Sequence, residues 1–192
     1  MNNKVMLKVE IFDKYGKVTS RIEKESESWC RAYGALMLAQ MRGSPTASPT
    51  APDTGNTNRT VKRAGQGFRC DGGLGTTTEG IRVGTSSQAV DMTDYAMIAA
   101  IAEGTGAGQM EHQATAVGTP SVAANVSSFT VSRTVVNNTG SSITVEECGI
   151  YGKGEDNSGT RYFLLCRDLT GSQVILDGGG ITVTYTISTT VG

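Results

Sequence analysis

The chain has 192 residues, which is enough for one domain with a buried core and an added arm. Hydrophobic residues make up 38% and charged residues only 18%, and Gly and Thr occur 25 times each, which favours strands and tight turns over long helices. The net charge of −1 gives no overall attraction to a phosphate backbone, and no stretch approaches the roughly 20 apolar residues of a membrane span, so we expect neither nucleic acid nor a membrane as a partner.

The N-terminal segment has the pattern of a β-hairpin. Residues 13–16 have the composition of a turn, and residues 17–23 return as a second strand. One face of the predicted first strand carries Val5, Leu7, Val9 and Ile11. Because apolar and polar residues alternate here, we expect this face to be buried.

A helix is predicted next, with Ser26 or Ser28 as its N-terminal cap and Gly43 as its C-terminal cap. Its apolar stripe consists of Trp29, Tyr33, Leu36, Met37 and Met41. We expect this stripe to pack against the hairpin. The alternative is that part of it docks against another subunit.

Residues 44–61 hold three of the four prolines and almost no apolar side chains. Such a segment buries too little surface to offset the entropy of ordering it. The sequence therefore predicts an extended loop or arm, either a surface excursion or a segment that orders against a neighbour in an assembly. The glycines of residues 62–80 and 104–108 lack the spacing of phosphate-binding and dinucleotide-binding loops, so we expect ordinary loops there.

Two short elements are expected before the last third of the chain. Residues 81–85 form a short strand, and residues 95–101 fit one or two helical turns. Thr93 or Asp94 is the expected cap of those turns, and Gly104 the expected stop.

The last third of the chain alternates strands with turns. Residues 137–140 and 177–180 are predicted turns, and residues 149–159 a polar loop. Residues 163–165 are apolar on both faces, as in a strand that is covered on each side. The predicted strands comprise residues 129–135, a segment from residue 143 up to the loop at residue 149, and residues 161–168 and 181–187.

These patterns predict a mainly β fold, an antiparallel β-sandwich (jelly-roll-like) with an N-terminal β-hairpin plus one α-helix. We divide the chain into the hairpin and helix at residues 1–43, the Pro/Thr-rich loop or arm at residues 44–61, and the β-sandwich core at residues 62–192. The first and last parts are expected to form one domain together.

Several of these strand and turn segments carry a family resemblance. They are residues 80–85, 94–96, 130–140, 143–151, 163–169 and 179–187, together with the N-terminal hairpin and helix. The chain resembles poorly characterised virion proteins of tailed bacteriophages. The resemblance implies a structural role in a virion after synthesis in the host cytoplasm, with major capsid or tail subunits as partners and a homo-oligomeric assembly. It brings no catalytic residue.

Several places in a particle fit this resemblance: capsid, neck, tail or baseplate. Capsid decoration is preferred, because a compact sandwich with an arm suits clamping neighbouring subunits, whereas a tail tube needs long strands and the predicted strands are short. The alternative is a receptor- or glycan-binding sandwich on a tail, with the loops at residues 65–80 and 152–159 as its surfaces. Aromatic residues total only 6%, which disfavours that alternative.

No pattern indicates an active site, so we expect a non-enzyme without catalytic, cofactor-binding or metal residues. His112 is the only histidine and has no nucleophile motif to serve, so we expect a surface or packing role for it. Glu146 and Glu147 point to opposite faces of a predicted strand and cannot act as a pair. Residues 155–157 lack the spacing of an EF-hand.

The four cysteines, Cys30, Cys70, Cys148 and Cys166, are scattered and form no C-x-x-C pair. With a single histidine in the chain, a zinc site is not expected. Cys148 and Cys166 fall on consecutive predicted strands, where a disulfide is sterically conceivable. We expect reduced, packed thiols, because cytosolic synthesis disfavours structural disulfides.

Overall fold

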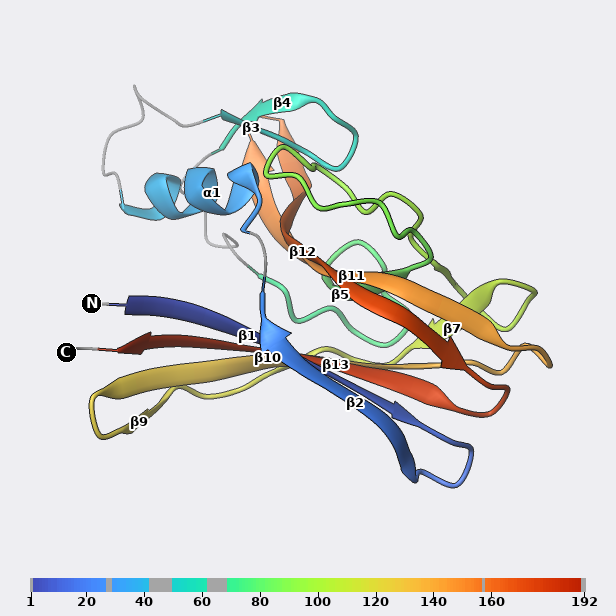
Figure 1. Ribbon diagram of the computed structural model, residues 1–192. Coiled ribbons are helices and arrows are strands. Elements are labelled where there is room, and N and C mark those ends of the chain that lie inside the picture. Colours follow the sequence, from blue (N-terminus) through green and yellow to red (C-terminus); the bar gives the residue numbers. More distant parts are fainter. Residues whose placement is uncertain (1, 27–28, 42–49, 62–68, 157, 191–192) are drawn as a thin grey trace.

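The computed structural model describes residues 2–26, 29–41, 50–61, 69–156 and 158–190, and it is mainly β (Figure 1). The large sheet contains β1 (Asn2–Phe12), β2 (Val18–Glu25), β6 (Ala102–Glu103), β7 (Gln109–His112), β8 (Ala116–Val117), β9 (Ser121–Ala123), β10 (Val126–Val136) and β13 (Gly180–Thr190). A second sheet contains β5 (Gly80–Gly84), β11 (Ile143–Asp156) and β12 (Gly159–Ile175). The helix α1 (Arg31–Met41) and the hairpin of β3 (Thr50–Pro52) and β4 (Asn58–Thr60) complete the described elements.

The two larger sheets face each other as the layers of a sandwich-like fold (Figure 1). The order in the first is β2-β1-β13-β10-β7-β6, with β8 and β9 also paired to β10, and the order in the second is β12-β11-β5. All pairings are antiparallel except the short one between β6 and β7. The mainly β, antiparallel fold class is confirmed, as are the N-terminal hairpin and, within the described ranges, the single helix.

The N-terminal hairpin is built into the large sheet. Along its whole length β1 pairs with β13, with Val9 opposite Val183. The predicted buried face is confirmed, because the odd-numbered apolar residues of β1 are all buried. Asp13 fixes the turn by accepting hydrogen bonds from the backbone N–H groups of Tyr15 and Lys17.

The main core lies between the two layers. Each fully buried Val, Leu, Ile or Phe side chain contributes about 1.5–3 kcal/mol to folding, so the facing rows provide the main stabilisation of the sandwich. The large sheet contributes Leu7, Val9, Val131, Val135, Val183 and Tyr185, and the smaller one contributes Ile81, Val83, Val145, Ile150, Phe163 and Leu165.

The smaller sheet is also covered on its outer face. There Cys30, Met97, Tyr151 and Leu164 form a second buried cluster. Residues 163–165 are therefore buried on both sides of the sheet, as their composition predicts. The outer cover consists of the segment between β5 and β6 and of the residues that lead into α1.

Two strands of the smaller sheet, β11 and β12, are much longer than predicted. β11 has 14 residues and β12 has 17, and they pair from Ile143 to Asp156, so the predicted polar loop at residues 149–159 is wrong. The glycines that indicated a loop are required by close strand packing: a Cβ added at Gly149 would lie 2.6 Å from the carbonyl oxygen of Cys166.

The predicted helical turns at residues 95–101 are also absent. Glu147 accepts a hydrogen bond from the backbone N–H of Ala99, and the hydroxyl of Tyr151 accepts one from the N–H of Met97. These backbone groups therefore bind side chains of the sheet below instead of the carbonyls of a helix.

The Pro/Thr-rich segment is only partly described, and the described part is ordered. Residues 50–60 form the hairpin of β3 and β4, where the sequence predicted an extended loop or arm. Asp53 accepts hydrogen bonds from the backbone N–H groups of Gly55 and Thr57 and from Arg59 Nε, which closes the turn. Residues 42–49 lie outside the described part.

Helix α1 begins later than predicted. Trp29 precedes it in an isolated bridge to Cys166 of β12, and the backbone N–H of Cys30 donates to the carbonyl of Leu165. Ser26 is not the cap, because its hydroxyl donates to Asp168. The other predicted caps, Ser28 and Gly43, lie outside the described residues. Within the described ranges, no helix is long and apolar enough to cross a membrane.

Candidate functional site

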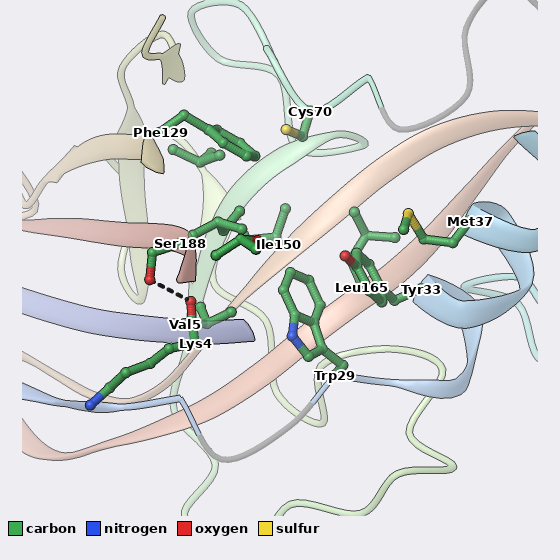
Figure 2. A pocket seen from close by; sticks show the side chains of 13 residues that line it. Lys4, Val5, Trp29, Tyr33, Met37, Cys70, Phe129, Ile150, Leu165 and Ser188 are labelled. Carbon is green, nitrogen blue, oxygen red and sulfur yellow. Dashed lines mark hydrogen bonds between the residues drawn. The ribbon is translucent and has the colours of Figure 1, made fainter. Parts of the chain in front are cut away.

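An apolar groove lies between the layers beside α1 (Figure 2). Its volume is about 550 Å³. Its lining is mainly aliphatic and aromatic: Val5, Trp29, Tyr33, Met37, Cys70, Phe129, Val131, Ile150, Leu165 and Ile187, with Lys4, Ser188 and Thr189 as polar members. A groove of this size and lining suits an apolar ligand or the apolar side chains of a partner.

The wall formed by α1 and by Trp29, which precedes it, carries three of the side chains that the sequence grouped as one stripe. The rings of Trp29 and Tyr33 stack with centroids 3.8 Å apart, and Met37 follows one turn later along the helix. Met37 is 40% exposed although it lines an apolar surface. The side chains of Leu36 and Met41 lie outside the described part, so their predicted role in the stripe stays a prediction.

The opposite wall belongs to the large sheet. Val5 of β1, Phe129 of β10 and Ile187 of β13 face the groove from three adjacent strands. At the rim, Ser188 donates a hydrogen bond to the carbonyl of Lys4, and Lys4 Nζ lies 3.4 Å from Glu25. Because Glu25 balances the charge of Lys4, the rim of this apolar groove is close to electrically neutral at that point.

A buried ionic cluster lies on the outer face of the smaller sheet. Arg167 Nε lies 2.5 Å from Glu147 Oε2, and its Nη1 lies 2.9 Å from Asp94 Oδ2. Arg167 Nη2 donates to the carbonyl of Gln88. The carboxylate of Glu147 raises the pKa of Arg167, although burial alone would lower it. This cluster attaches residues 88–99 to the sheet and exposes no reactive group, because Arg167 and Glu147 are fully buried.

A second buried cation, Arg133 of β10, binds carbonyl groups alone. Its guanidinium donates to four backbone oxygens at 2.5–3.0 Å, and burial lowers its pKa to about 10. The acceptors are the carbonyls of Gly73, Thr76, Ile81 and Gln113. Arg133 therefore joins the loop around residue 75 and the edge of β5 to the large sheet.

His112 lies at the end of β7 and is fully buried. Its Nδ1 lies 2.9 Å from Glu103 Oε2 and 3.1 Å from the carbonyl of Met110, and burial lowers the pKa of the imidazole. Its Nε2 is buried without a partner in the described structure. Of the two roles expected for His112, the structure shows packing.

Glu146 and Glu147 lie on opposite faces of β11. Glu147 is buried in the ionic cluster, whereas Glu146 points away and accepts hydrogen bonds from the backbone and hydroxyl of Ser172. Their opposite orientation confirms the prediction. Asp156, from the acidic segment that was compared with an EF-hand, forms ion pairs with Arg161 and Arg59. Among the described residues, no group of three possible metal ligands occurs.

All four cysteines are free thiols. Cys148 and Cys166 are not opposite each other: Cys148 pairs with Asp168 and Ile150 pairs with Cys166. Burial raises the pKa of Cys30 to about 12 and that of Cys70 to about 11, and it raises the pKa of Cys148 and Cys166 as well. Thiols of this kind stay protonated at neutral pH and are poor nucleophiles.

Sequence reasoning missed Arg82, Arg133 and Arg167 as organising residues. Arg82 is a single charge between Ile81 and Val83, and that interruption of an apolar strand was the available signal for it. Arg133 lies between polar residues and Arg167 is followed by Asp168, so neither carries that signal. No known protein family matches this chain, and neither does any curated protein or any solved structure.

Proposed function

We propose that this chain is a structural subunit of a tailed-phage virion, in the first place a capsid decoration protein that assembles as a homo-oligomer and packs against neighbouring subunits. The apolar groove between the layers carries the proposal. Trp29, Tyr33 and Met37 form one wall, and the partly exposed Met37 is apolar surface that a single chain leaves in water. Apolar surface of this kind at a defined place is typical of interaction sites.

The rigidity of the frame also supports a structural role. Two sheets enclose a continuous core, and buried arginines attach long connecting segments to them. Such fixed connections make a subunit rigid, and a rigid subunit keeps its shape when neighbouring subunits pack against it. The resemblance of its strand and turn segments to virion proteins gives the class of assembly.

A tail, neck or baseplate position is the second candidate. The objection that tail-tube subunits need long strands no longer holds, because β11 and β12 have 14 and 17 residues. The partners in that case are tail subunits instead of the major capsid protein.

Mass spectrometry of purified particles tests the proposal. The chain is expected in stoichiometric amounts, in a fixed ratio to the major capsid protein or to a tail protein, and a particle reconstruction then distinguishes the two positions. Absence of the chain from purified particles would refute the proposal.

A further inference from the structure

A second pocket lies on the outer face of the smaller sheet, away from the apolar groove. Its volume is about 330 Å³. Hydroxyl-bearing residues are prominent in its wall: Thr54, Thr77, Thr78, Tyr151 and Tyr162. They come from the β3–β4 turn, the segment before β5, and strands β11 and β12, so four separate parts of the chain converge here.

Among the described residues, Arg82 of β5 is the only charged one that lines this pocket. Its Nη2 donates to the carbonyl of Ile101 at 3.1 Å, and its Cζ lies 5.5 Å from the centre of the Tyr151 ring. Nη1 has no hydrogen-bond acceptor in the described structure, and Nε is buried without one. Unlike Arg167, Arg82 has no carboxylate within 4.0 Å among the described residues. A guanidinium with unused donors beside a pocket is incompletely compensated.

The walls of the pocket are fixed before any ligand arrives. The backbone N–H of Thr54 donates to the carbonyl of Tyr162, which attaches the β3–β4 turn to β12. The backbone N–H of Met97 donates to the hydroxyl of Tyr151, which attaches the opposite wall to β11. A preformed pocket loses little conformational entropy when it binds a ligand.

The described lining of the pocket contains one cation, Arg82, and no carboxylate. Glu79 is a neighbouring carboxylate, and it accepts a hydrogen bond from Thr78 Oγ1 without lining the pocket. Carboxylate geometry matches the planar fork of a guanidinium, and hydroxyl groups donate and accept hydrogen bonds, as the hydroxyls of a sugar require.

We propose that this pocket binds an acidic sugar of monosaccharide size, whose carboxylate pairs with Arg82 and whose hydroxyls contact the threonine and tyrosine hydroxyls. Its volume lies at the small end of the range for ligand sites, roughly 300–1,000 Å³. Such a pocket gives the predicted glycan-binding alternative a defined location beside residues 77–78. The site does not depend on a place in a virion, so failure of either proposal leaves the other standing.

Calorimetric titration of the full chain with glucuronate and with N-acetylneuraminate, with glucose as the neutral comparison, tests this site. At least one acidic sugar is expected to bind saturably, and at least tenfold more tightly than glucose. Arg82→Gln is expected to weaken that binding at least tenfold. Arg69→Gln is the matched control, because Arg69 is paired with Asp71 outside the pocket.

A second variant covers the case in which Arg82→Gln fails to fold. Ala96 lines the pocket without contributing charge, so Ala96→Phe fills it and is expected to abolish binding while Arg82 is retained. Three outcomes would overturn the proposal: no saturable binding of either acidic sugar, equal binding of glucose, or equal losses in the Arg82 and Arg69 variants.

Discussion

Three arginines of this chain are removed from water to different degrees and are compensated differently. Arg167 has two carboxylates, Arg133 has four backbone carbonyls, and Arg82 has one carbonyl and the face of an aromatic ring. A buried charge is tolerated only when its hydrogen-bonding groups find partners. The first two arginines are therefore structural, and the third has capacity left for a ligand.

Arg167→Met is expected to lower the free energy of unfolding by about 3–5 kcal/mol, because Glu147 would keep a buried charge without its cation. Denaturant unfolding measures this loss. Residues 88–99 should also exchange their amide hydrogens faster, since Arg167 binds Gln88 and Asp94.

Lys8→Met is the control for the loss of a cation. Lys8 lies 2.7 Å from Glu10 but on the accessible surface, so its removal is expected to cost less than about 1 kcal/mol. If Arg167→Met and Lys8→Met lost the same free energy of unfolding, burial of the ion pair would not be the cause of the larger loss that is expected for Arg167→Met.

The pH dependence of stability should reveal His112. Burial lowers the pKa of its imidazole from 6.5, although Glu103 acts in the opposite direction. The unfolded chain therefore binds the proton first, so the contribution of His112 is complete above pH about 6.5 and is lost as the pH falls below that value. Urea unfolding at pH 7, 6 and 5 measures this effect. The free energy of unfolding should fall less between pH 7 and pH 5 in His112→Gln than in the wild type, and an equal fall in both proteins would contradict this prediction.

At the scale of elements, the backbone of β12 approaches β11 closely at Gly149. A side chain there would meet backbone, so Gly149→Ala is expected to cost about 1–3 kcal/mol. Gly34 in α1 has no atom within 4 Å of an added Cβ, and Gly34→Ala is expected to gain up to about 1 kcal/mol. Thermal unfolding should give midpoints that move in opposite directions, and a neutral Gly149→Ala would exclude the close contact.

The sequence predicts those elements whose pattern is local. The alternation in β1, β10 and β13 needs only neighbouring residues, and these strands are confirmed. The errors occur where distant partners decide the structure: Glu147 binds the backbone of residues 98–99, and β12 pairs with the glycine-containing part of β11.

The candidate sites were predictable only in part, for the same reason. The aromatic and methionine stripe that includes Trp29 and Met37 was visible in the sequence, but its opposite wall is built by β1, β10 and β13. The Arg82 pocket is lined by residues from several segments between Thr54 and Tyr162. These segments come together only in the folded chain, so no motif in the sequence predicts the pocket.

At the scale of the whole molecule, the two ends of the sandwich differ in character. The N-terminal and C-terminal strands end side by side below α1, at the end that carries the apolar groove (Figure 1). The opposite end of the large sheet consists of tight turns, among them the turn that carries Tyr15, which is 83% exposed. The first end offers a concave apolar surface to a neighbour.

Met37→Glu tests whether the groove mediates assembly. The substitution places a charge on apolar surface at a partly exposed position, so the fold should be retained while incorporation into particles falls at least tenfold. Quantitative mass spectrometry of purified particles measures incorporation, and circular dichroism checks the fold. Tyr15→Glu, at the opposite end, should be incorporated normally. If the wild type enters particles and Met37→Glu enters equally well, the groove is not the contact surface, because a buried unpaired carboxylate would exclude a neighbour.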